Sequence, residues 1–344
     1  MNQITSHERP GVYSSYEAST LVSASRRGGV VGIAAKSGSE HKNTLYRLSR
    51  YEEAVSTFGE GDTLTGLIRL LFQNGASAVY AVAAGEEGYD TAFSLLEQAE
   101  GLTAVVCDST DLSVQQALRQ SVLEASAARR ERIAVVSGGA EGVSELTERA
   151  QALNCERVVL VAPALSEGEG AELAAAVAGA IAGETDPAVP LGGAELTGVG
   201  GLSAAYGDSE IDLLVRGGVT PVEEVGGICS VVRGVTTRTT TGEAPDNTWR
   251  ELTTIRIVDD VIPAVRNALR AKFRRAKNTE QSRGAIRSQV VLELENKRSR
   301  EIITDYGEVL ARADEENPNV CVVEFSFTVA HGLNQIWLSA HITV

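Results

Sequence analysis

The chain has 344 residues, which is enough for two domains or for one large domain with appendages. Its 43% hydrophobic and 22% charged residues are typical of a soluble globular protein, and no apolar run reaches the roughly 18 residues that cross a bilayer. The net charge of −15 is uneven, because residues 1–224 hold 15 basic and 31 acidic residues (−16) and residues 225–344 hold 16 and 15 (+1). We therefore expect neither nucleic-acid binding nor direct membrane insertion, whereas the near-neutral carboxyl-terminal third could contact an acidic partner.

The amino terminus and the cysteines indicate where the protein is made. The first 20 residues lack the basic and apolar regions of a signal peptide, so we expect synthesis in the cytoplasm. The four cysteines are far apart and contain no CxxC pair (Cys107, Cys155, Cys229, Cys321). We expect reduced, buried thiols rather than disulfides or a metal site.

Residues 1–25 are polar, and we expect them to form an extended arm. In the segment 26–215, short apolar runs alternate with amphipathic segments. The runs predict strands at residues 30–35, 77–84, 103–108, 132–138 and 157–163, and the other segments predict helices at 63–73, 89–100, 111–129, 143–153 and 169–182. Asp111 can cap the third of these helices. Near-continuous apolar strands separated by helices predict an α/β domain with a mostly parallel sheet flanked by helices.

The composition changes after a Gly/Pro-rich connection at residues 187–207. Beyond it, the patterns predict strands at 227–240, 249–260, 301–309 and 320–331, an amphipathic helix at 260–278 and another helix at 284–296. We therefore expect a carboxyl-terminal α+β domain over residues 216–331, followed by an arm at 332–344.

The last nine residues, IWLSAHITV, have the period-2 pattern of a half-buried strand. The apolar positions are Ile336, Leu338, Ala340, Ile342 and Val344. Terminal residues usually fray unless a sheet holds them, so the sequence raises the question of which sheet receives this strand. An edge strand within the same molecule is one answer, and a strand donated to another molecule is the other.

No catalytic constellation is visible in the sequence. Gly28, Gly29 and Gly32 precede and enter a strand, whereas a dinucleotide loop needs its glycines after the strand, so we interpret them as turn glycines. No GxxxxGK[ST] loop, GxSxG elbow or HExxH motif occurs. The four histidines have no metal-ligand spacing (His7, His41, His331, His341).

Three pairs of adjacent residues that contain acidic side chains remain as candidates for chemistry. Glu223-Glu224 and Asp259-Asp260 could act as acid/base groups, but Asp259-Asp260 is also expected at the amino end of the 260–278 helix, where it would offset the helix dipole. Cys107-Asp108 ends a strand, where α/β enzymes place ligands. With nothing convergent around them, we predict no enzyme activity, no cofactor and no metal.

Several stretches are more specific than these candidates, and in order along the chain they resemble contractile phage tail sheath proteins. The most specific segment runs from Gly217 to Ile262, and residues 85–200 match in pattern more than in letters. The stretches are ERPGVY (8–13), GGVVGIAA (28–35), QNGASAVYAV (73–82), GGVTPVEEVGG (217–227), VVRGVTTRTT (231–240) and TWRELTTIRIVDDVI (248–262). The compact chain fits a myophage, a prophage or a phage-tail-like bacteriocin.

The resemblance implies a structural protein that works as a polymer. Six subunits would form a ring around an inner tube, rings would stack helically, and contraction would drive the tube through a target envelope. Such a sheath would assemble in the bacterial cytoplasm with its tube, baseplate and tail terminator proteins and then be part of the virion tail or released particle. Its carboxyl-terminal domain would face the tube.

The resemblance also implies that both terminal arms add strands to the sheets of neighbouring subunits. The amino-terminal arm contains Pro10, Gly11, Val12 and Tyr13, and the carboxyl-terminal arm contains the closing strand. Ordering nine residues costs about 1–2 kcal/mol each. Backbone hydrogen bonds return only about 1 kcal/mol each. Burial of the large apolar side chains, at about 1.5–3 kcal/mol each, would therefore decide whether such an arm docks.

The helix at 260–278 has two stripes. Ile262, Val265, Leu269, Phe273 and Ala276 form an apolar stripe, and a basic stripe beside it contains Arg266, Arg270, Arg274 and Lys277. The basic stripe is either a solvated helix face or, with the family's geometry, an attachment surface for an acidic tube.

Two rival interpretations remain at this stage. One is an α/β enzyme or ligand-binding protein with a site at the carboxyl ends of the parallel strands. The other is a type VI-like secretion sheath, which normally needs a second, smaller sheath protein.

Overall fold

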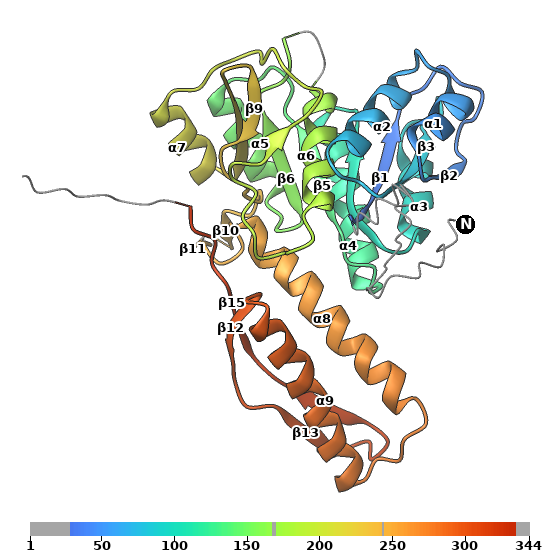
Figure 1. Cartoon of the computed structure of the whole chain (residues 1–344), viewed down its shortest axis with the longest axis vertical. Coiled ribbons are helices and arrows are strands. Elements are labelled where there is room, and N and C mark those ends of the chain that lie inside the picture. The colour runs from blue at the N-terminus through green and yellow to red at the C-terminus, as the bar shows by residue number, and fades with distance from the viewer. Residues whose placement is uncertain (1–27, 167–169, 243, 335–344) are drawn as a thin grey trace, which may run out of the picture.

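The computed structural model describes residues 28–166, 170–242 and 244–334. Figure 1 shows an α/β domain from which a pair of long helices and a β-hairpin extend as a narrow carboxyl-terminal module. The expected α/β class is confirmed, with a large sheet that is mostly parallel.

Nine strands form this sheet, in the order β2-β3-β1-β4-β5-β6-β8-β9-β7. The neighbouring pairs from β3 to β8 are parallel, and β2, β9 and β7 are added antiparallel at the two sides. The strands are β1 (Val30–Ala35), β2 (Leu45–Leu48), β3 (Ala78–Ala83), β4 (Leu102–Cys107), β5 (Ile133–Ser137), β6 (Val158–Ala162), β7 (Glu195–Leu196), β8 (Val219–Val225) and β9 (Ile228–Val231).

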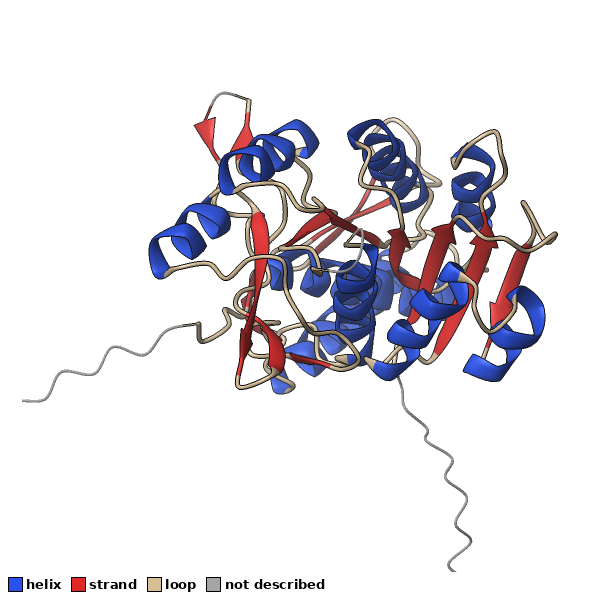
Figure 2. Ribbon diagram, turned by 90° about the horizontal axis from the view of Figure 1, so that it is seen from above, coloured by secondary structure: helices blue, strands red, loops and turns tan. Residues whose placement is uncertain are grey.

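Helices cover both faces of the sheet, as Figure 2 shows from above. They are α1 (Tyr51–Phe58), α2 (Thr63–Gln73), α3 (Asp90–Gln98), α4 (Leu112–Ala127), α5 (Val143–Leu153), α6 (Ala171–Gly183) and α7 (Asp208–Arg216). One hydrophobic core packs α1, α2 and α6 against one face, and a second core packs α3, α4, α5 and α7 against the other. Asp111 caps α4 as expected, because its side chain accepts a hydrogen bond from the Ser113 N–H.

The helix α6 is buried almost throughout, and it packs closely against the end of α2 through glycines. A Cβ atom at Gly75 would lie 2.7 Å from the Gly183 Cα, and one at Gly179 would lie 2.8 Å from the Leu71 carbonyl oxygen. Gly75 also has a φ of 120°, a conformation that other residues rarely adopt. The Ala- and Gly-rich sequence of α6 therefore lets two helices and the sheet approach without voids.

The strand predicted at 249–260 is wrong, because these residues begin the long helix α8 (Leu252–Phe273). The β-branched Thr253, Thr254, Ile255 and Ile257 favoured a strand. All residues from 252 to 257 are buried, so the amphipathic pattern that reveals a helix is missing from its first turns. Asp259-Asp260 consequently lie in the second and third turns of α8 rather than at its amino end.

The domain boundary expected at residues 215/216 lies between two strands of one sheet. β8 pairs with β6, and β9 pairs with β8, so both belong to the α/β domain. The predicted strand at 227–240 ends at Val231, and the described residues that follow it form the short pair β10 (Thr240–Thr241) and β11 (Ala244–Pro245) and an isolated bridge between Val235 and Glu251. The carboxyl-terminal module therefore starts within α8.

This module consists of α8, α9 (Glu280–Ser299) and one long, bent β-hairpin. Its outgoing arm is β12 (Ile303–Tyr306) and β13 (Leu310–Ala313), and its returning arm is β14 (Cys321–Glu324) and β15 (Phe327–Val329). β12 pairs with β15 and β13 with β14, and between them the Gly307 N–H donates to the Ser326 carbonyl at 2.9 Å. A small separate core joins the hairpin to the two helices. We call residues 303–329 the ribbon.

Candidate interaction surfaces

Both terminal arms that the sequence singles out lie outside the described residues. These are Pro10, Gly11, Val12 and Tyr13 at the amino end, and Ile336, Leu338, Ala340, Ile342 and Val344 at the carboxyl end. The surfaces that such arms could meet can be described.

The ribbon has edges that could accept a strand. Within the described part of the chain, each of its four strands has one neighbouring strand, so both long edges of the hairpin carry unpaired backbone groups. Leu310 and Val320 are 42% and 43% exposed near the far end of the ribbon. On its outer face the Arg312 guanidinium contacts Glu324 across the strands at 2.8 Å. A two-stranded hairpin with open edges and exposed apolar side chains is suited to strand addition.

The start of α8 is anchored firmly in the α/β domain. Arg157 donates two hydrogen bonds to the Asp259 carboxylate, at 2.7 and 2.8 Å, and the two side chains are 11% and 17% exposed. Buried Arg256 donates to the carbonyl oxygens of Ile181 and Glu184, which end α6. Lys297 of α9 contacts Asp260. The pair Asp259-Asp260 is therefore committed to ion pairs that position helices and is not available as a free acid/base pair.

The basic stripe predicted on the 260–278 helix is divided by the fold. Arg266 faces the α/β domain, where its guanidinium contacts the Glu131 carboxylate at 2.6 Å. Arg270, Arg274 and Lys277 are exposed, but α8 ends at Phe273, so the last two lie beyond the helix. Arg275 is also exposed beside them, although helical spacing did not single it out. We call Arg270, Arg274, Arg275 and Lys277 the basic tip.

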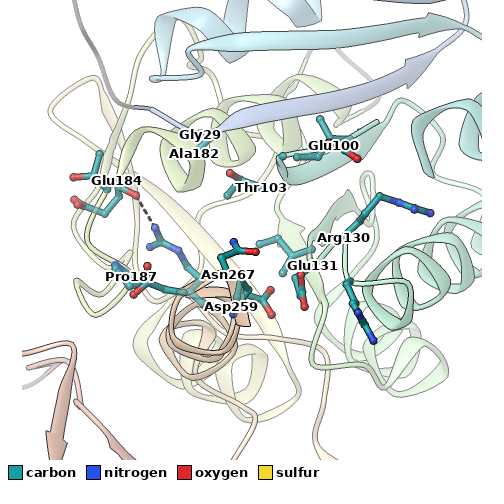
Figure 3. Close-up of a pocket in the computed structure, with 18 of the residues that line it drawn as sticks. Gly29, Glu100, Thr103, Arg130, Glu131, Ala182, Glu184, Pro187, Asp259 and Asn267 are labelled. Carbon is teal, nitrogen blue, oxygen red and sulfur yellow. Dashed lines mark hydrogen bonds between the residues drawn. The ribbon is translucent and has the colours of Figure 1, made fainter. Parts of the chain in front are cut away.

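A cavity of about 600 Å³ separates α8 from the amino ends of β1, β4 and β5. Figure 3 shows Glu131 extending toward Asp259 and Asn267 of α8 on the opposite wall. Gly29 lies at its edge, where a Cβ atom would be 2.1 Å from the Thr103 Oγ1, and a Cβ at Gly28 would be 2.4 Å from the Gly75 carbonyl oxygen. These two glycines are explained by close packing, without a phosphate-binding role.

The carboxyl ends of the parallel strands give no support to the enzyme interpretation. Burial raises the pKa of the Cys107 thiol to about 12, so this group is not a nucleophile at neutral pH. Asp108 accepts hydrogen bonds from the Tyr89 hydroxyl and the Lys36 N–H. Glu223 and Glu224 lie on the exposed end of β8. Among the described residues, no group of three His, Cys, Asp or Glu side chains could hold a metal ion.

None of the described helices is both long and apolar enough to cross a membrane.

Two family models match the sequence. The phage tail sheath protein central domain matches residues 82–237, and the phage tail sheath C-terminal domain matches residues 244–343. The two ranges cover most of the chain. No curated protein matches it significantly.

Solved structures share the fold at low sequence identity. A chain of the anti-feeding prophage baseplate, six-fold symmetrised, has a TM-score of 0.73 and 18% identity, covering 99% of this chain and 100% of that chain. The anti-feeding prophage helical sheath in the contracted state has a TM-score of 0.72 and 17% identity, covering 98% and 99%. The sheath tail protein from Listeria innocua has a TM-score of 0.73 and 12% identity, covering 88% and 92%.

The resemblance predicted from the sequence is thus confirmed. Both sheath domain models match the chain, and its α/β domain with a helical and β-hairpin module is the fold of the solved sheath structures. The chain belongs to the phage tail sheath protein family, and its role is structural, as a subunit of a tail sheath.

Proposed function

We propose that this chain is the repeating subunit of a contractile sheath, arranged as stacked rings of six subunits around an inner tube. Contraction of the extended sheath drives the tube through a target cell envelope. The particle is assembled in the bacterial cytoplasm with a baseplate and a tail terminator. The observation that carries the proposal is the ribbon, whose two edges are unpaired among the described residues, together with the alternating apolar sequence of residues 336–344.

The terminal arms join the subunits in this proposal. The closing strand of one subunit adds to an edge of the ribbon of another, and its backbone hydrogen bonds and alternating side chains fix the register. One small core holds the two-stranded ribbon against α8 and α9, and a hairpin without such packing is only marginally stable in water. Added strands would therefore stabilise the ribbon and link the polymer at the same place.

The carboxyl-terminal module faces the tube, and the basic tip lies in the last turn of α8 and just beyond it. Arg270, Arg274, Arg275 and Lys277 are exposed, in the part of the chain that has no net negative charge. Their ion pairs with an acidic tube align the subunit more than they hold it, because exposed pairs contribute about 0–1 kcal/mol each. Repetition around a ring makes the sum significant.

Subunit packing stores the mechanical energy. The sequence contains no P-loop that would couple the motion to nucleotide hydrolysis. The extended sheath is then a metastable arrangement of the same folded subunits, and contraction releases the difference in packing free energy.

The experiment is a charge scan of the closing strand. Replacement of Leu338 and Ile342 with Asp should abolish polymers seen by electron microscopy, because burial of a charge opposes strand docking by several kcal/mol. Circular dichroism should show an intact fold. The matched control is Ser339→Asp with Thr343→Asp, which places the same charges on the alternate positions and should retain most assembly. Equal loss of polymers in both variants, or normal polymers in the first, would contradict the proposed link.

A further inference from the structure

The connection between the α/β domain and the carboxyl-terminal module depends on one helix. Among the described residues, α8 is the segment through which the chain passes from one to the other. Its first turns are buried, and Arg256 and Asp259 bind groups of the α/β domain. The remainder of α8 carries α9 and the ribbon, so the angle of this helix sets where the module lies.

α8 has a weak point just after its anchored turns. Pro263 lies inside the helix and has no N–H to donate to the preceding turn, which is a common cause of bending. On this side α8 faces the cavity of about 600 Å³, which is lined by Asp260, Pro263 and Asn267. Packing at the first turns alone would therefore leave the outer part of α8 free to tilt.

Beyond the proline, one ion pair connects α8 to the α/β domain. The Arg266 guanidinium reaches the Glu131 carboxylate at 2.6 Å, and the two side chains are 31% and 14% exposed. Glu131 immediately precedes the buried Arg132 and the strand β5, so it is held on a rigid element of the α/β domain. Burial would raise the pKa of Glu131, but the hydrogen bond and charge of Arg266 outweigh burial and the pKa lies below its ordinary value.

We propose that Arg266 is a positioning residue whose ion pair with Glu131 acts as a strut, fixing the angle of the carboxyl-terminal module to the α/β domain. Arg266 does not touch the tube; it determines where the basic tip of each subunit points. With this ion pair in place, the α/β domain and the carboxyl-terminal module of a subunit move as one rigid body. The opposite side of the module is braced independently, where Gly332 packs against Pro190 closely enough that a Cβ would lie 2.9 Å away.

The inference rests on the proposed function for its effect on the tube, but the strut itself can be tested without one. The variants are Arg266→Glu, Glu131→Arg and the charge-exchanged double variant. Glu124→Arg, at an exposed position of α4, is the charge-matched control for Glu131→Arg. The first measurement is urea unfolding of each variant below the concentration at which it polymerises. The second is co-sedimentation of sheath with its cognate tube at low salt.

Each single variant should raise the equilibrium constant for unfolding by about fivefold. In the exchanged pair this constant should return to within about twofold of its value in the original protein. Co-sedimentation with the tube should fall in each single variant and recover in the exchanged pair, although residue 266 is acidic in that pair. Glu124→Arg should behave as the original protein in both measurements.

Two results would overturn the strut. Additive unfolding effects in the double variant would mean that the two side chains are not coupled. Normal co-sedimentation for Glu131→Arg, together with failure of Arg266→Glu and of the exchanged pair, would mean that Arg266 contacts the tube directly. If no variant and no original protein binds a tube while unfolding shows the coupling, the proposed function fails and the strut stands.

Discussion

Loss of Arg157 should loosen the joint between the two parts of the subunit, and the structure indicates by how much. In Arg157→Met the apolar stem is kept, whereas both hydrogen bonds to Asp259, at 2.7 and 2.8 Å, are lost. The carboxylate is left with a side chain only 17% exposed and without its counter-ion. Burial already raises the pKa of Asp259, and removal of Arg157 takes away the group that opposes this rise.

Removing one partner of a fully buried pair costs about 3–5 kcal/mol. The residual exposure of both groups reduces this to about 2–4 kcal/mol, because solvent screens part of the charge. For a chain of 344 residues this corresponds to a fall in Tm of roughly 3–6 °C. Replacing both partners with apolar residues, in Arg157→Met with Asp259→Leu, should cost less than the single change, since no unpaired charge remains.

The assay is chemical denaturation of the two single variants and the double variant below the concentration at which the protein polymerises. The double variant should lose less stability than the two single variants added together, because the two residues are in direct contact. A double variant as unstable as the sum of the single variants would refute the assignment of this pair as the anchor of α8. So would an Arg157→Met variant with an unchanged denaturation midpoint.

Three further changes test other parts of the molecule. Replacing Arg270, Arg274 and Lys277 with Glu should leave tube-free polymers intact and reduce co-sedimentation with the tube. Added salt should likewise reduce co-sedimentation of the original protein. If the variant and the original protein co-sedimented equally at low salt, the basic tip would be only a solvated surface. Because the pKa of Glu131 is lowered in the folded protein, this residue stabilises the fold above its ordinary pKa of 4.5, and that contribution is lost as the pH falls through the lower folded-state pKa. Glu131→Gln should therefore flatten the dependence of the denaturation midpoint on pH in this acid range. An unchanged profile would contradict the strut. Gly75→Ala should destabilise the α/β domain by about 1–3 kcal/mol, whereas Gly66→Ala, at a helical position with no atom near its Cβ, should stabilise it by about 0.5–1 kcal/mol in thermal melts.

The alternation of strands and helices in the α/β domain was predictable from the sequence because the pattern of each element is local. The helices α2 and α5 begin and end where the apolar spacing placed them, and Asp111 caps α4. The short elements α1, β2 and β7 were missed, as were α7 and β8, which follow the Gly/Pro-rich connection. The first turns of α8 were assigned as a strand, because burial on all sides removes the helical period from the sequence.

The contacts that orient the carboxyl-terminal module could not be predicted, because they join residues distant in the sequence. Asp259 binds Arg157, 102 residues away, and Arg266 binds Glu131, 135 residues away. Helical spacing placed Arg266 in a stripe with Arg270 and Arg274, since spacing shows which residues share a face but not what that face meets. The helix end at Phe273, which separates Arg274 from the stripe, also carries no clear stop signal.

The central claim is that the subunits are joined by strands donated to the ribbon. Cryo-electron microscopy of the polymer formed by the full-length chain tests it most directly. We predict helically stacked layers of six subunits, with a strand of residues 336–344 from a neighbouring subunit hydrogen-bonded along one edge of the ribbon at residues 303–329. A polymer in which both ribbon edges are bare, or in which residues 336–344 pair within their own subunit, would contradict the account.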